Sequence, residues 1–78
     1  YQFKQAAELA RSSDDWDQLA RVTQLWLQDD AGAPLARLYA GEAAIHRGEL
    51  ERATELLEGL TQSHPQIAES WLYLSSLY

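Results

Sequence analysis

The sequence contains no cysteine, and only two prolines and four glycines among its 78 residues. Without cysteine the chain has no disulfide framework and no thiolate-ligated metal site, although this absence identifies no cellular compartment. Because proline is confined to positions 34 and 65, long stretches are free to form helix. No segment approaches the roughly 18 unbroken apolar residues that a membrane-spanning helix needs. We therefore expect no direct membrane insertion by this segment.

Positive charge is also scarce, since six basic residues face twelve acidic ones and the net charge is -6. Binding to phosphate backbones or anionic lipid requires clustered Lys and Arg. The composition therefore predicts no nucleic-acid partner. The excess of Arg over Lys, together with frequent Ala, favours a bacterial source. The basic residues form no stripe: Lys4, Arg11, Arg21, Arg37, Arg47 and Arg52.

Apolar residues recur at intervals of three and four, the spacing that places side chains on one face of an α-helix. The pattern is clearest over residues 16–26 and 50–60. Ser and Asp at 13–15 precede the first of these stretches and can accept hydrogen bonds from unpaired helix N–H groups. Pro34 and Pro65 are predicted to begin new helices, where a missing N–H costs nothing. Five helices are predicted, near residues 2–12, 15–28, 34–47, 50–63 and 66–78.

The sequence repeats itself without a gap at a spacing of 34 residues. Small residues recur at Ala7, Gly41 and Ser75, and Leu38-Tyr39 returns as Leu72-Tyr73. Such small residues matter because two antiparallel helices approach closely only where one offers a minimal side chain. The repeat divides the chain into residues 1–33, 34–67 and 68–78.

A 34-residue helix–turn–helix period resembles the tetratricopeptide repeat. The clearest match is residues 68–78, which resemble the family's first-helix signature of Trp, then Leu and a small residue, then Tyr. The first repeat departs from the pattern, with Leu19 in place of alanine and Ala31 in place of proline, and Arg37 stands where Trp is preferred. The middle repeat matches the family at Gly41, at Gly48-Glu49-Leu50, at Ala53 and at Pro65.

The resemblance implies an all-α fold, a tetratricopeptide-like α-solenoid of antiparallel helix pairs wound into a right-handed superhelix, with about five helices here. It also implies binding of a partner protein or peptide in a concave groove lined by the first helix of each pair, with no enzyme activity and no cofactor. The resemblance would also place Tyr1 in this groove. The groove residues carried over from the family are Lys4, Glu8, Arg11, Leu35, Leu38, Tyr39, Glu42, His46, Leu72 and Tyr73.

Two occupants of the groove differ in their charge requirements. Family members that grip acidic peptide tails use basic side chains, whereas Glu8 and Glu42 would repel a carboxylate. The tyrosines Tyr39 and Tyr73 instead favour an amphipathic helix or an extended peptide. The alternative is that residues such as Leu38 pack between neighbouring first helices without contacting a partner.

Sites of other kinds lack the residues that they need. Asp14, Asp15 and Asp17 suggest a calcium loop, but the central Gly and distal Glu are missing, so helix capping explains them better. The two histidines, His46 and His64, do not occur at a metal-ligand spacing. No pair of carboxylates is placed for acid–base catalysis. The two tryptophans at 16 and 26, which could stack on RNA bases, lie on positions predicted to face the core.

The chain begins at Tyr1 and ends at Tyr78 within an apolar-periodic run, which predicts a segment of a longer protein. We expect flanking repeats or self-association to cover the apolar residues of 68–78, because repeat arrays expose apolar faces at uncapped ends. The expected role is a non-catalytic scaffold in a bacterial cell-envelope or secretion assembly. Two alternatives are a purely architectural spacer within a longer solenoid and a regulatory module fused to an enzyme.

Overall fold

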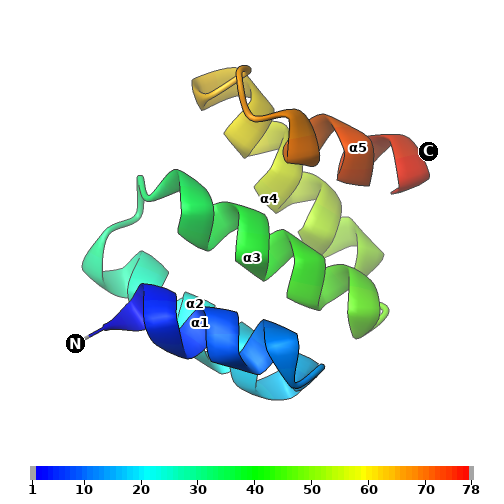
Figure 1. Cartoon of the computed structure of the whole chain (residues 1–78). Helices are drawn as coiled ribbons and strands as arrows, with labels where there is room; N and C mark the ends of the chain where they lie inside the picture. Colours follow the sequence, from blue (N-terminus) through cyan, green and yellow to red (C-terminus); the bar gives the residue numbers. More distant parts are fainter. Residues whose placement is uncertain (1, 78) are drawn as a thin grey trace.

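The computed structural model describes residues 2–77, and its regular structure in that range is entirely α-helical (Figure 1). The all-α class and the five predicted helices are confirmed. None of the helices described is long and apolar enough to cross a bilayer. The helices are α1 (Phe3–Ser12), α2 (Trp16–Asp29), α3 (Pro34–His46), α4 (Leu50–Ser63) and α5 (Ala68–Leu77).

The turn between α1 and α2 reverses the chain through a residue in the left-handed region, Asp14, with φ of 54°. The N–H of Asp15 donates to the carbonyl of Ala10 at 2.9 Å, and the N–H of Asp14 donates to that of Arg11 at 3.1 Å. These two bonds satisfy carbonyls that the last turn of a helix leaves unpaired.

The turn between α3 and α4 repeats this geometry 34 residues later. Gly48 takes the place of Asp14, with φ of 79°. The N–H of Glu49 donates to Ala44 at 2.8 Å, and that of Gly48 donates to Ile45 at 3.1 Å. The sequence period therefore has a counterpart in the backbone of the turns.

The connections from α2 to α3 and from α4 to α5 also match each other. After α2, the N–H of Asp30 donates to Trp26 at 2.8 Å, and that of Ala33 donates to Asp30 at 3.1 Å. The corresponding bonds after α4 run from His64 to Leu60 at 2.7 Å and from Ile67 to His64 at 3.2 Å.

Pro65 does not begin a helix, contrary to the prediction, because α5 starts at Ala68. The proline lies in the connection, and its carbonyl accepts a hydrogen bond from Nε1 of Trp71 at 2.9 Å. Pro34, by contrast, is the first residue of α3. The repeat explains the difference, since Pro34 corresponds to Ala68 and Pro65 corresponds to a turn residue, Ala31.

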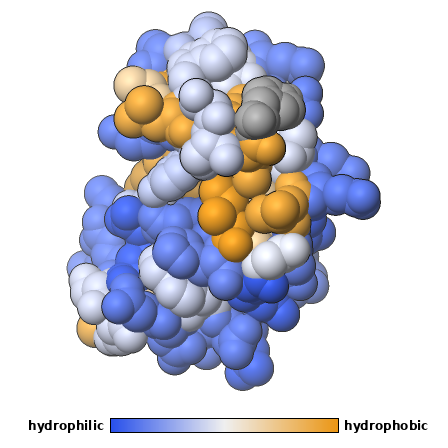
Figure 2. Space-filling view, turned by 90° about the vertical axis from the view of Figure 1, so that its right-hand side faces the viewer, coloured by the Kyte–Doolittle hydropathy of each residue, from blue (hydrophilic) through white to orange (hydrophobic). Residues whose placement is uncertain are grey.

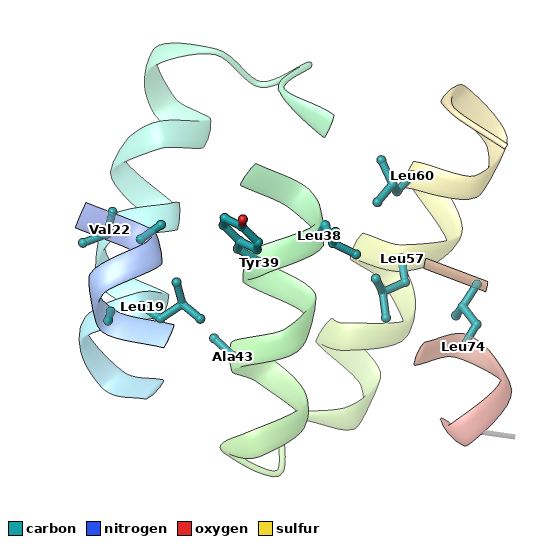
Figure 3. Close-up of a cluster of buried hydrophobic side chains, with 10 residues drawn as sticks. Leu19, Val22, Leu38, Tyr39, Ala43, Leu57, Leu60 and Leu74 are labelled. Carbon is teal, nitrogen blue, oxygen red and sulfur yellow. The ribbon is translucent and has the colours of Figure 1, made fainter. Parts of the chain in front are cut away.

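The core forms where α3 packs between α2 and α4, while α1 packs on α2 and α5 packs on α4. Figure 3 shows Leu19 and Val22 approaching α3 from one side and Leu57 and Leu60 from the other. These four side chains are buried. Burying each one stabilises the folded state by roughly 1.5–3 kcal/mol, because its apolar surface is removed from water. The helix α3 is therefore the structural centre of the described chain.

Candidate partner-binding face

Helices α1, α3 and α5, which are the first helices of the three successive repeats, lie on one side of the molecule, in front of α2 and α4 in Figure 1. A chain of hydrogen bonds joins them. Arg11 of α1 donates from Nε to Oε1 of Glu42 at 2.6 Å and from Nη2 to Oε2 at 3.1 Å. Tyr73 of α5 donates from its hydroxyl to Oε2 of the same glutamate at 2.7 Å. Glu42 of α3 therefore connects all three helices.

Glu42 is only 5% exposed, so its charge depends on these partners. Burial by itself raises the pKa of the Glu42 carboxyl, but hydrogen bonds from Arg11 and Tyr73 and the charge of Arg11 outweigh it and lower that pKa. The hydrogen bond to Glu42 in turn raises the pKa of the Arg11 guanidinium. Burial, followed by the hydrogen bond to Glu42, raises the pKa of Tyr73 to about 12.

Tyr39 lies beneath the ion pair and belongs to the core. Its side chain is 6% exposed, and the guanidinium carbon of Arg11 lies 4.5 Å from the centre of its ring. Its ring also contacts Trp26 of α2, whose ring centre lies 6.5 Å away in an edge-to-face arrangement. A cation above an aromatic face is attracted by the ring quadrupole, so Tyr39 holds Arg11 in position.

A hollow of about 530 Å³ opens beside the ion pair, between α1, α3 and the start of α2. Its wall includes the indole of Trp16, whose ring stacks on His46 with centres 3.7 Å apart and planes 2° apart. The exposed Glu8 and Ser12 flank the hollow. The lining residues are Glu8, Arg11, Ser12, Trp16 and Glu42.

The predicted groove residues fall into three groups. Leu38, Tyr39 and Glu42 are buried, so they offer little free surface to a partner. Tyr1 lies outside the described residues. Exposed positions are Lys4, Glu8, His46 and Leu72, and half-buried positions are Arg11, Leu35 and Tyr73. The structure brings Glu8, Arg11 and Glu42 together at the hollow, and Tyr39 and Tyr73 at the ion pair.

The sequence analysis does not predict the pairing of Arg11 with Glu42. It predicts instead that Glu42 repels the carboxylate of a ligand. In the structure the positive charge of Arg11 compensates the negative charge of Glu42. A signal was present, because Arg11, Glu42 and Tyr73 follow one another at a constant separation of 31 residues. A separation of 31 residues is shorter than the 34-residue repeat by about one helical turn. Residues at this separation therefore lie on facing sides of neighbouring first helices.

The acidic residues at the start of α2 have structural roles. The side chain of Asp15 caps α2 by accepting from the N–H of Gln18 at 3.2 Å. Asp17 pairs with Nε of Arg47 at 3.1 Å. Within residues 2–77, no group of three or more His, Cys, Asp or Glu residues is arranged to hold a metal ion.

Comparison of the chain with protein-family models finds no matching family. Comparisons with curated proteins and with solved structures find no match either. What this face binds is therefore inferred from its own residues.

Proposed function

We propose that this chain is a tetratricopeptide-type solenoid segment that binds a partner protein or peptide and performs no catalysis. The binding surface is the face of α1, α3 and α5 around the hollow. The observation that carries the proposal is the connection of three successive first helices through Glu42 at one constant separation.

The repeated turns support the solenoid arrangement. Both kinds of connection recur after 34 residues with the same backbone hydrogen bonds. Each helix packs mainly on its neighbours in sequence, in the order α1, α2, α3, α4 and α5. Stacked repeats are expected to make contacts of this nearest-neighbour kind.

The polar connection across the face supports a binding role because it holds the surface in a fixed shape before a partner arrives. Both oxygens of Glu42 are hydrogen-bonded, and the guanidinium of Arg11 is held between that carboxylate and the ring of Tyr39. A preorganised surface loses less side-chain freedom on binding, which favours affinity.

The hollow offers chemistry that suits a peptide. Ser12 and Arg11 can hydrogen-bond backbone carbonyls, and the indole of Trp16 supplies apolar contact. An acidic peptide tail fits poorly, because Glu8 stands beside Arg11 and the charge of Arg11 is already compensated by Glu42. The preferred ligand is therefore a neutral or basic peptide segment.

Panning a random peptide display library against the immobilised chain tests the proposal. We expect selected peptides to compete with one another, and Glu8→Lys to weaken their binding about tenfold or more, equivalent to about 1.4 kcal/mol. The matched control is Glu55→Lys, which makes the same charge change at an exposed position of α4. Failure to enrich any peptide, or equal loss of binding in both variants, would contradict the proposal.

A further inference from the structure

The hollow beside the ion pair contains one carboxylate that nothing neutralises. Glu8 lines this hollow and is exposed, and within residues 2–77 it forms no ion pair. Arg11, which lines the same hollow, is already compensated by Glu42, whose Oε1 lies 2.6 Å from its Nε. A cation that enters the hollow therefore meets a free carboxylate at Glu8 and no uncompensated guanidinium on the lining.

A second hollow, of about 390 Å³, shares the indole of Trp16 with the first. Three carboxylates line it against one guanidinium, that of Arg47, which already pairs with Asp17 at 3.1 Å. Figure 2 faces the side of the molecule at which α1 and α3 end, and its lower half is largely hydrophilic. The surroundings of the indole are therefore acidic in both hollows. The second hollow is lined by Asp14, Asp15, Trp16, Asp17, His46 and Arg47.

The indole of Trp16 is held in place as a flat surface shared by the two hollows. His46 of α3 stacks on it, with ring centres 3.7 Å apart and planes 2° apart. His46 does not line the first hollow, whereas the indole does, so part of the indole stays open to an occupant there. Tryptophan offers the most favourable aromatic face for a cation, because the ring quadrupole attracts positive charge. The open indole and the free carboxylate therefore select the same kind of group.

We propose that the first hollow takes an arginine side chain of the partner, presented by a peptide segment of net positive charge. The guanidinium stacks against the indole of Trp16 and donates hydrogen bonds to the carboxylate of Glu8. The acidic lining of the second hollow attracts the rest of such a segment. This inference rests on the proposed function, since it names the side chain that anchors the peptide.

Arginine matches both walls of the hollow better than other side chains. Its planar guanidinium stacks on an aromatic ring while its N–H groups reach a carboxylate, whereas the ammonium of lysine is a strongly hydrated point charge. An apolar side chain would cover Glu8 without giving its carboxylate a partner, which costs free energy. The volume of about 530 Å³ lies within the range of roughly 300–1,000 Å³ that is typical of ligand pockets, so a whole side chain fits.

The exposed acids of α4 lack this combination and provide an internal control. Glu51, Glu55 and Glu58 are exposed along that helix, whose sequence contains no aromatic residue. A basic peptide attracted only by the negative charge of the chain would bind there as readily as at Glu8. A peptide anchored by arginine in the hollow would not.

NMR titration of the 78-residue chain with the blocked peptide Gly-Gly-Arg-Gly-Gly tests the proposal. The reporter is the indole N–H signal of Trp16, assigned among those of the three tryptophans. We expect this signal to shift saturably, with a dissociation constant in the millimolar range, because one side chain supplies most of the contact. The same peptide with neutral citrulline in place of arginine should bind at least about tenfold more weakly, and the peptide with lysine about threefold more weakly.

Glu8→Gln removes the negative charge with little change of shape, and it should weaken binding of the arginine peptide about tenfold. The matched control, Glu55→Gln, makes the same change at an exposed position of α4 and should leave the dissociation constant unchanged. Both side chains are exposed, so both variants should fold as the wild type does, which circular dichroism checks.

Three results would overturn the inference: an unmoved Trp16 signal, equal binding of the citrulline peptide, or equal weakening in the two variants. The proposed function would survive any of them if panning still selects competing peptides that Glu8→Lys weakens, because those peptides would then bind without an arginine anchor. Failure of panning together with an unmoved Trp16 signal would overturn both.

Discussion

Gly41 of α3 packs directly against the side chain of Leu57 in α4. A Cβ placed on Gly41 would lie 2.8 Å from Cγ and 2.9 Å from Cδ2 of Leu57, which are distances that real Cβ atoms essentially never show. Leu57 is completely buried, so its side chain has no free space into which it can move. The contact between the two helices therefore depends on the missing side chain at position 41.

Gly41→Ala is expected to destabilise the fold by about 1–3 kcal/mol, because overpacking outweighs the roughly 1 kcal/mol that alanine gains in helix propensity. Gly59→Ala is the control, since a Cβ there would meet Nη2 of Arg37, the far end of a flexible side chain. We expect that variant to be neutral or more stable. Urea unfolding monitored by circular dichroism measures both, and equal effects would contradict the packing argument.

Gly48→Ala should destabilise the chain by about 1 kcal/mol, because a residue with a Cβ is strained at the φ of 79° observed there. The cost is purely conformational, as nothing lies within 4 Å of an added Cβ. Asp14→Gly, at the equivalent turn with φ of 54°, should stabilise the chain, because glycine adopts this conformation without strain. Thermal unfolding of the two variants compares them directly, and a stabilised Gly48→Ala protein would refute the prediction.

Arg11→Leu should destabilise the fold by about 1–3 kcal/mol, because it leaves the buried Glu42 without its cationic partner. The double variant with Glu42→Leu should recover much of that loss, since no unpaired charge then remains. Asp17→Asn is the control at the exposed pair with Arg47 and should cost less than about 1 kcal/mol. Denaturant unfolding of the wild type, Arg11→Leu, Glu42→Leu, the double variant and Asp17→Asn decides between additive and coupled effects.

Alkaline titration should show that Tyr73 ionises late. The pKa of Tyr73 is raised to about 12 from an ordinary value of 10.0, so its contribution to stability is full below pH 10. That contribution is lost as the pH rises from 10 towards 12, because the unfolded chain ionises first. Ultraviolet absorbance of tyrosinate, with Tyr73→Phe to identify the group, measures the shift. Ionisation of Tyr73 at its ordinary pKa of 10.0 would contradict the hydrogen bond to Glu42.

Acid should weaken the fold through Glu42, whose folded-state pKa lies below its ordinary value of 4.5. Its contribution to stability is present above pH 4.5 and disappears as the pH falls through the folded-state pKa. Glu42→Gln removes this dependence, so the difference in unfolding free energy between wild type and variant should shrink on acidification. An unchanged difference would show that the carboxylate is not favoured by its partners.

The helices and turns were largely predictable because their determinants are local. Periodic apolar residues predicted five helices, and all five are present. Pro65 was placed wrongly because a proline before a helix can lie either in the first turn or in the connection. In the structure Pro65 lies in the connection, where its carbonyl accepts a hydrogen bond from the indole of Trp71, six residues further along the chain.

The character of the candidate face was less predictable, because it depends on which side chains meet across helices. The sequence placed Tyr39 and Glu42 on a common face, and the separation of 31 residues between Arg11 and Glu42 hinted at their pairing, but neither gave the 6% exposure of Tyr39 or the geometry of the ion pair. Those facts require the spacing and rotation of α1 relative to α3. No local pattern within either helix encodes that rotation.

Leu38 and Leu72 occupy equivalent positions of successive repeats but differ in burial, so they show what the sequence determines and what only the tertiary structure decides. The sequence fixes both as leucines at the same position of successive repeats, on the same side of a first helix. Leu38 is nevertheless 7% exposed and Leu72 is 69% exposed. Helical periodicity sets the direction in which a side chain points, whereas burial depends on whether another helix lies against it. For Leu38 the packing of α3 against α4 and α5 supplies that neighbour, and for Leu72 the described chain does not.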